Sequence, residues 1–207
     1  WKIAVNNITA EGYYGHTDNL DWDRPAKLGI SLGEKVPNDA ILIAGQHDKS
    51  LQWEGMPDLG TYAVQTIQRV QKYTDRPILM RFHPRCQPFI PHHRFKMLLQ
   101  NENIYNCDIE IPKPVVNTYD VFDIDYAFHT VINHCSGPGI NAVIAGSNVL
   151  VDKKSLAYPM SIKLNQIENP PQKRNKDRWL VEISHTEYTV DEIAEGLWLT
   201  RLKNALE

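Results

Sequence analysis

Four short, largely apolar segments recur along the chain, and they constrain its fold more than any other feature of the sequence. They cover residues 40–44, 78–82, 130–133 and 148–152. Short apolar runs of this kind are typical of strands that are buried on both faces of a parallel sheet. Stretches with helical spacing lie between them, so that strands and helices alternate along the chain. This order predicts an α/β fold.

The stretches between the predicted strands carry apolar residues at helical intervals. In the clearest of them, residues 61–73, the side chains of Ala63, Ile67 and Val70 lie on one helical face. The sequence therefore predicts a Rossmann-like parallel sheet with helices on both of its faces. The other expected elements are a helix at residues 94–100, a strand at 104–111 and a helix at 139–145.

A capping box marks the expected start of the last helix. Thr189 and Glu192 are three residues apart, so that each side chain can bond the backbone N–H of the other. We expect one helix from this point on. Its buried face would hold Ile193, Leu197, Trp198, Leu202 and Leu206.

The regular alternation begins only near residue 40. Residues 1–39 are interrupted by several glycines and prolines, and we interpret them as an irregular lead-in, possible remnant of an N-terminal domain. Residues 40–207 form the predicted Rossmann-like domain. A chain of 207 residues is long enough for one substantial core.

Charge and cysteine content limit the classes of partner and the cellular compartment. The chain has 22 Lys and Arg against 25 Asp and Glu, and this balance gives no general attraction to nucleic acid or to anionic lipid. No apolar run approaches the ~18 residues of a membrane span, so we expect no such span. The three widely spaced cysteines build neither a disulfide framework nor a CxxC motif, which favours the reducing cytoplasm.

Polar side chains follow the predicted strands at the edge where ligands bind in open α/β sheets. Two arginines and a histidine after the second strand suit the oxygens of a diphosphate, although an arginine there could instead pair with a local carboxylate. The Ser-Gly-Pro-Gly turn after residue 133 could present backbone N–H groups and a positive helix end to an anion, or could simply make a tight turn. The predicted ligand-binding residues are Gln46, Arg81, His83, Arg85, Asn133, Ser136, Gly137 and Gly139.

A zinc site is the main alternative for the histidines. His83, Cys86, His92 and His93 lie within eleven residues, and imidazole and thiolate both bind zinc. However, two prolines hold this stretch extended, and it contains no matched pair of ligands at a known spacing. We therefore predict no metal site.

Several motifs, in their order along residues 40–205, resemble the C-terminal part of GT-B glycosyltransferases, above all those related to capsular-polysaccharide transferases and to phage or marine glycosyltransferases. The motifs are Gly45-Gln46, Arg81-Phe82-His83-Pro84, Ser136-Gly137-Pro138-Gly139-Ile140-Asn141-Ala142 and Asp177-Arg178-Trp179-Leu180. The resemblance implies one half of a GT-B fold, which binds a nucleotide-diphosphate sugar and transfers the glycosyl group to a polysaccharide or other polymer.

The same resemblance implies roles for individual residues. Arg81 and His83 would face the donor phosphates, residues 136–139 would supply backbone donors, and Gln46 would border the cleft. No divalent metal or other cofactor is required, and no catalytic residue is assigned. Two alternatives stay open, namely a nucleotide-sugar epimerase of the same fold and a non-catalytic nucleotide- or glycan-binding module.

Overall fold

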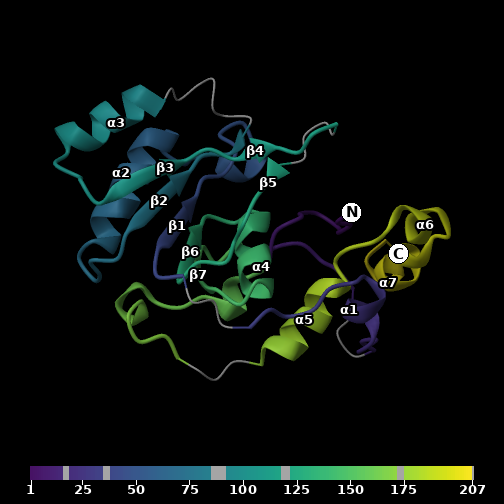
Figure 1. Cartoon of the computed structure of the whole chain (residues 1–207). Coiled ribbons are helices and arrows are strands. Elements are labelled where there is room, and N and C mark those ends of the chain that lie inside the picture. Colours follow the sequence, from purple (N-terminus) through teal and green to yellow (C-terminus); the bar gives the residue numbers. More distant parts are fainter. Residues whose placement is uncertain (16–18, 35–37, 85–91, 118–121, 172–174, 207) are drawn as a thin grey trace.

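Five parallel strands form the central sheet of the computed structural model, which describes residues 1–15, 19–34, 38–84, 92–117, 122–171 and 175–206 (Figure 1). The predicted Rossmann-like α/β fold is therefore confirmed. In spatial order the strands are β3-β2-β1-β6-β7. Their bounds are β1 (Ile41–Ala44), β2 (Ile78–Arg81), β3 (Cys107–Glu110), β6 (Thr130–Asn133) and β7 (Asn148–Val151).

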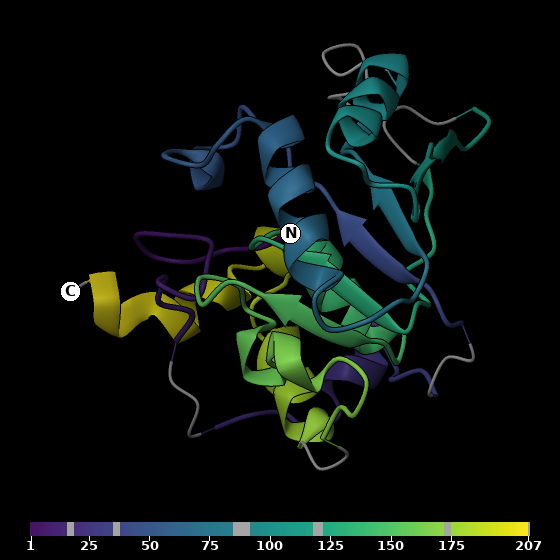
Figure 2. The same cartoon turned by 90° about the vertical axis from the view of Figure 1, so that its left-hand side faces the viewer.

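Helices cover both faces of the sheet, as Figures 1 and 2 show. Helices α2 (Leu59–Val70) and α3 (His92–Asn101) lie on one face, and α4 (Gly137–Ile144) and α5 (Lys176–Ser184) lie on the other. The central strand β1 divides its side chains between the two cores. Ile41 and Ile43 pack towards α2, whereas Leu42 and Ala44 pack towards α4. All four are buried, which explains why this strand is apolar throughout.

Local interactions explain where helix α2 begins and where helix α4 ends. Asp58 precedes α2, and its carboxylate accepts a hydrogen bond from the Thr61 backbone N–H at 3.0 Å. Helix α4 is followed by Gly146, whose φ of +90° is favourable only for glycine. A side chain at Gly146 would also collide with the backbone of Glu34, so this glycine lets the lead-in pass close beneath α4.

The remaining elements are short, and part of them was not predicted. A two-stranded antiparallel ribbon, β4 (Lys113–Pro114) with β5 (Phe122–Asp123), projects beyond the sheet (Figure 1). The strand expected at 104–111 is limited to β3. Among the described residues, 3₁₀ turns in the connections include η1 (Leu51–Trp53), η3 (Tyr158–Met160) and η4 (Leu164–Gln166).

The end of the chain forms two helices, so the prediction of a single final helix is wrong. Gly196, at φ +73°, separates α6 (Val190–Ala194) from α7 (Leu197–Leu206). The break turns Leu197 outwards, leaving it 47% exposed, while Leu202 is buried. The predicted capping box of Thr189 and Glu192 is confirmed at the start of α6.

The irregular lead-in packs against this C-terminal part. A short helix in it, α1 (Arg24–Lys27), lies beside α5. Further upstream, the Ile3 N–H donates to the Thr186 carbonyl at 3.3 Å, and Lys2 forms an antiparallel bridge with Glu187. Within the described part of the chain, no helix combines the length and apolarity needed to cross a membrane.

Candidate functional site

The sheet places a cavity where its strand order changes direction. From β1 the chain adds β2 and β3 on one side and β6 and β7 on the other, so the connections after β1 and β6 lead apart at the carboxyl edge. Ligands of open α/β sheets bind at such points. A cavity of about 390 Å³ lies there, and its wall is mostly apolar. Residues in the wall include Gly45, Arg81, His83, Phe122, Tyr126 and Pro138.

Arg81 is buried in the wall of this cavity and is held by Glu110. The parallel register of β2 and β3 places the two residues opposite each other. The guanidinium donates to Glu110 from Nε (3.1 Å) and from Nη2 (2.8 and 2.9 Å). Its third nitrogen, Nη1, is buried and has no hydrogen-bond partner among the described residues. The pair thus neutralises the arginine's charge but leaves one buried donor unused.

Two aromatic rings flank the same guanidinium. Its central carbon lies 5.3 Å from the ring centre of Tyr126 and 5.7 Å from that of Phe128. Both distances are within the range of cation–π attraction. Burial raises the pKa of Tyr126, and the nearby Arg81 charge opposes this rise. The phenol therefore stays neutral beside the cavity at physiological pH.

His83 stands at the same edge and contacts a residue that was not among the predicted site residues. Its ring meets that of His47 edge to face, with 5.2 Å between the ring centres. Nδ1 of His47 accepts a hydrogen bond from the Lys49 backbone N–H at 3.0 Å. The signal that could have identified His47 is its place directly after Gln46, at the end of the first strand. Arg85 lies outside the described residues.

Gln46 and Asn133 are buried and link the two loops that diverge from the edge. The side-chain oxygen Oε1 of Gln46 accepts the Cys135 backbone N–H at 3.3 Å, and Nε2 of Gln46 donates to Gln52 Oε1 at 3.2 Å. The Asn133 amide donates to the Ala44 carbonyl at 2.8 Å, and Asn133 Oδ1 accepts the Ser136 N–H at 2.9 Å. These bonds fix the loops at the edge of the sheet and use most of the hydrogen-bond donors and acceptors of the two side-chain amides.

Helix α4 begins beside the cavity. Ser136 occupies the N-cap position, but its side chain bonds Asn133 and caps no backbone N–H of the first turn. Pro138, in the first turn of the helix, lines the cavity. A Cβ at Gly139 would lie 2.9 Å from Val151 Cγ1, so close packing on β7 requires this glycine. At Gly137, in contrast, a Cβ would meet open space.

A second cavity of about 290 Å³ lies on the opposite face of the sheet, beside α2. Its wall contains Tyr62, Arg69, His134 and Asp152, none of which was among the predicted site residues. Burial lowers the pKa of His134, while the charge of Asp152 opposes this effect. The His134 ring also meets the buried Trp53 edge to face at 5.6 Å. The cavity is therefore lined by a neutral imidazole at physiological pH.

The described residues contain no group of three or more His, Cys, Asp and Glu side chains that could hold a metal ion. The zinc alternative is not tested by this finding, because Cys86 and the side chain of His92 lie outside the described part.

Comparison with known proteins gives a structural likeness but no sequence relative. No protein-family model matches the sequence, and no curated protein matches it. Among solved structures, the chain is similar to KpsC of Thermosulfurimonas dismutans, a beta Kdo 2,7 transferase, with 16% identity and a TM-score of 0.44. The match covers 80% of this chain and 50% of KpsC, so the chain spans about half the length of that structure. The sheet itself shows the chain to be a Rossmann-like α/β protein with a cavity at its carboxyl edge.

Proposed function

We propose that the chain binds a nucleotide-diphosphate sugar at the carboxyl edge of its sheet and takes part in transferring the glycosyl group to a polysaccharide or other polymer. The observation that carries this proposal is the unused, buried Nη1 of Arg81 in a cavity where the strand order reverses. A buried donor without a partner costs about 1–3 kcal/mol, and a ligand oxygen would remove this cost.

The proposal divides the ligand between two kinds of surface. Because Glu110 neutralises Arg81, the arginine offers the ligand a directed hydrogen bond more than a net charge. The remaining negative charge of a diphosphate would be met by the start of α4 and by His83. The rings of Phe122 and Tyr126 suit the flat face of a base or a sugar.

In the proposed transfer, an acceptor hydroxyl oxygen forms a bond to the anomeric carbon. The bond from that carbon to the diphosphate oxygen breaks, and its electron pair stays on the departing diphosphate. Arg81 Nη1 and the first turn of α4 would stabilise this charge without a metal ion. The acceptor proton would pass to a base that this proposal does not assign.

A thermal-shift screen of uridine, cytidine, guanosine and adenosine diphosphate sugars tests the binding step. A donor at a hundred times its Kd stabilises the native chain by about 2.7 kcal/mol, which raises Tm by about 5–11 °C. Arg81→Met should abolish the shift, whereas Arg178→Met, which removes an exposed arginine of α5, should leave it unchanged. If no nucleotide sugar raises the Tm of the unaltered chain, the proposed donor site is wrong.

A non-catalytic binding module is the second candidate, because the described residues that line the cavity include no carboxylate. The same composition disfavours an epimerase, which would need acidic groups in the cleft. Incubation with a radiolabelled sugar nucleotide that gives a thermal shift separates the candidates. Transfer or hydrolysis of the label supports the enzyme, an altered sugar supports the epimerase, and an intact nucleotide sugar supports the module.

A further inference from the structure

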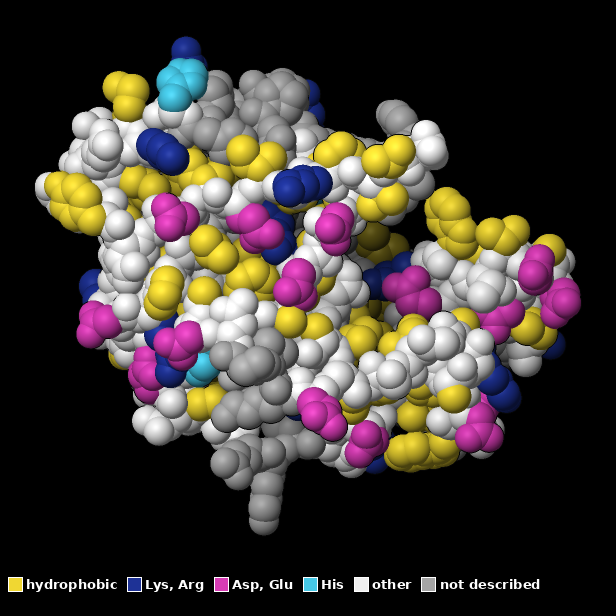
Figure 3. Space-filling model, in the orientation of Figure 1, with side chains coloured by type: hydrophobic (Ala, Val, Ile, Leu, Met, Phe, Trp, Pro, Cys, Tyr) yellow, Lys and Arg dark blue, Asp and Glu magenta, His cyan; other side chains and the backbone are white. Residues whose placement is uncertain are grey.

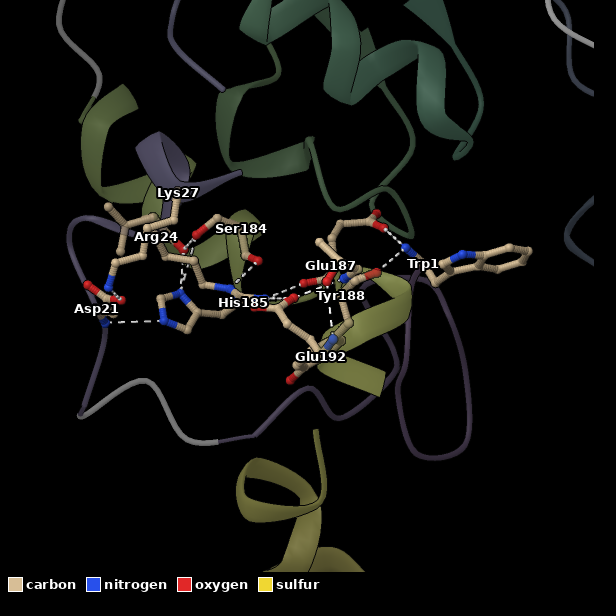
Figure 4. A network of polar contacts seen from close by, with 11 residues as sticks. Trp1, Asp21, Arg24, Lys27, Ser184, His185, Glu187, Tyr188 and Glu192 are labelled. Atoms are coloured by element: carbon tan, nitrogen blue, oxygen red, sulfur yellow. Dashed lines mark hydrogen bonds and ion pairs between the residues drawn. The ribbon is translucent and has the colours of Figure 1, made fainter. Parts of the chain in front are cut away.

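A buried histidine joins the lead-in to the C-terminal helices, far from the cavity described above. His185 directly follows α5 and is 5% exposed. Its Nδ1 lies 2.8 Å from the Val181 carbonyl oxygen, and its Nε2 lies 3.1 Å from the backbone nitrogen of Asp21 (Figure 4). The ring thus bridges two segments that are more than 160 residues apart in the sequence.

These two contacts determine the protonation state of the ring. A carbonyl oxygen only accepts hydrogen bonds, so Nδ1 must carry a proton. The Asp21 backbone N–H only donates, so Nε2 must be free of one. The neutral Nδ1–H tautomer satisfies both partners. A second proton on Nε2 would set two N–H groups against each other and would break the bond to Asp21.

Charged groups around the ring come from two other segments, residues 19–28 and α7. Arg24 of α1 and Arg201 of α7 oppose a positive charge on the imidazole, whereas the Asp21 carboxylate favours it. Asp21 is itself bound by Lys27 at 2.6 Å, which offsets much of its charge. On α5, the Ser184 hydroxyl donates to the Val181 carbonyl at 2.7 Å and lies 3.4 Å from Nδ1. Burial is the largest effect and lowers the pKa of His185; the hydrogen bond to the Val181 carbonyl opposes it, and the two arginines add to it.

Residues 19–28 are held against the C-terminal helices by a second set of contacts, which does not titrate at neutral or mildly acidic pH. The Arg24 guanidinium donates to the Ser184 carbonyl (2.9 Å), to the Glu187 carbonyl (2.6 Å) and to both oxygens of the Glu192 carboxylate (2.6 and 3.0 Å). Arginine stays charged, and its guanidinium lowers the pKa of Glu192. Near neutral and mildly acidic pH, the titrating contact of this segment is therefore the one at His185.

We infer that His185 is a proton-sensitive clasp, which holds residues 19–28 against α5 while its ring is neutral and loosens them when Nε2 is protonated. The clasp weakens as the pH falls, because the contacts of the closed state, in which Nε2 accepts the Asp21 N–H, require a neutral ring. The clasp is fully effective above about pH 6.5, the ordinary value for a released histidine. Below it, the closed state weakens tenfold for each pH unit, until the pH reaches the pKa of the closed state.

Hydrogen exchange on the full chain between pH 4.5 and 7.5 tests the clasp, because exchange detects rare openings. Rates are divided by the intrinsic rate at each pH. We expect peptides covering residues 19–28 to lose protection tenfold per pH unit below about pH 6.5, while peptides of β1 keep theirs. His185→Gln, whose amide can donate to Val181 and accept from Asp21, should show no such loss. His93→Gln, at an exposed histidine of α3, should behave as the unaltered chain does.

The inference is overturned if protection of residues 19–28 does not change with pH, if it falls equally in His185→Gln, or if β1 loses protection in parallel. NMR of the unaltered chain provides a test that does not depend on the variant. The ¹⁵N shifts should identify Nδ1 as the protonated nitrogen at pH 7.5. A different tautomer, or a His185 pKa at or above the ordinary value, would equally overturn the clasp.

Discussion

Replacing Glu110 by Gln should destabilise the chain far more than the loss of an ordinary surface charge. Glu110 is the ionic partner of Arg81, whose side chain is only 4% exposed. Glutamine keeps the shape and one acceptor oxygen, but it leaves a buried guanidinium without a counter-charge. The perturbation therefore measures how strongly β3 fixes the arginine on which the proposed ligand contact depends.

The magnitude follows from the burial of the two partners. Removing one partner of a buried ion pair costs about 3–5 kcal/mol. The Glu110 side chain is 33% exposed, so water can take over part of its role, and we expect a loss of about 2–3 kcal/mol. For a chain of this size, such a loss lowers Tm by about 4–12 °C.

Urea and thermal unfolding, followed by circular dichroism, measure this loss. Glu182→Gln is the matched control, since Glu182 accepts a hydrogen bond from Arg178 at 2.9 Å and is about as exposed as Glu110, but the Arg178 side chain is 57% exposed, against 4% for Arg81. We expect less than about 0.5 kcal/mol there. A double variant with Arg81→Met should show a coupling of about 0.5–3 kcal/mol between the two positions. If Glu110→Gln costs no more than Glu182→Gln, the pair does not hold Arg81 and the reasoning fails.

Three further predictions concern other parts of the chain. Gly139→Ala should lower the free energy of unfolding, measured in urea, by about 1–3 kcal/mol, because the added methyl group would crowd Val151. Gly137→Ala is the control and should leave the stability unchanged or raise it slightly, so that equal effects of the two changes would contradict the packing argument. Thr189→Ala should remove a cap of α6 and cost about 1 kcal/mol, and an unchanged unfolding midpoint would refute the role of the capping box. Burial and the charge of Asp108 raise the pKa of Cys107 to about 12, so iodoacetamide at pH 8 should modify this thiol only after the chain unfolds. Peptide mapping measures the modification, and labelling of Cys107 in the native chain would contradict the prediction.

The sheet could be predicted from the sequence because its strands are short and buried on both sides. Residues 41–44, 78–81, 130–133 and 148–151 lie in short, largely apolar runs, which are typical of strands buried on both faces of a sheet. The ribbon of β4 and β5 escaped prediction because each strand has two residues and no apolar alternation. The break at Gly196 was missed since the apolar spacing continues across it.

The sequence indicates which residues gather at the candidate site, but not which hydrogen bonds these residues make. Strand ends show which side chains gather at the edge. They do not show that Gln46 binds the backbone of Cys135, 89 positions later, or that Asn133 binds Ala44 across the same gap. The partner of Arg81 could have been predicted, because Glu110 lies near the end of the predicted strand 104–111, at the same edge. Choosing it required knowing that β3 lies beside β2.

Figure 3 adds a feature that composition only suggested. On the face shown, acidic and basic side chains are interspersed, and the surface is hollowed between the β4–β5 ribbon and the terminal segments, with hydrophobic side chains in the recess. No single sign of charge dominates this face. Recognition of a charged ligand there would depend on individual contacts such as the one proposed for Arg81 and not on a long-range field.

The central position of β1 has a consequence for how the chain reaches its native state. One edge of β1 pairs with β2, so that Ile41 lies opposite Ile78. The other edge pairs with β6, so that Ile41 lies opposite Thr130. During synthesis, a ribosome must therefore add almost ninety residues after Ile41 before the second edge can be covered. Until then β1 exposes unpaired backbone and apolar side chains, so that the middle of the finished sheet is the segment most open to aggregation in the nascent chain.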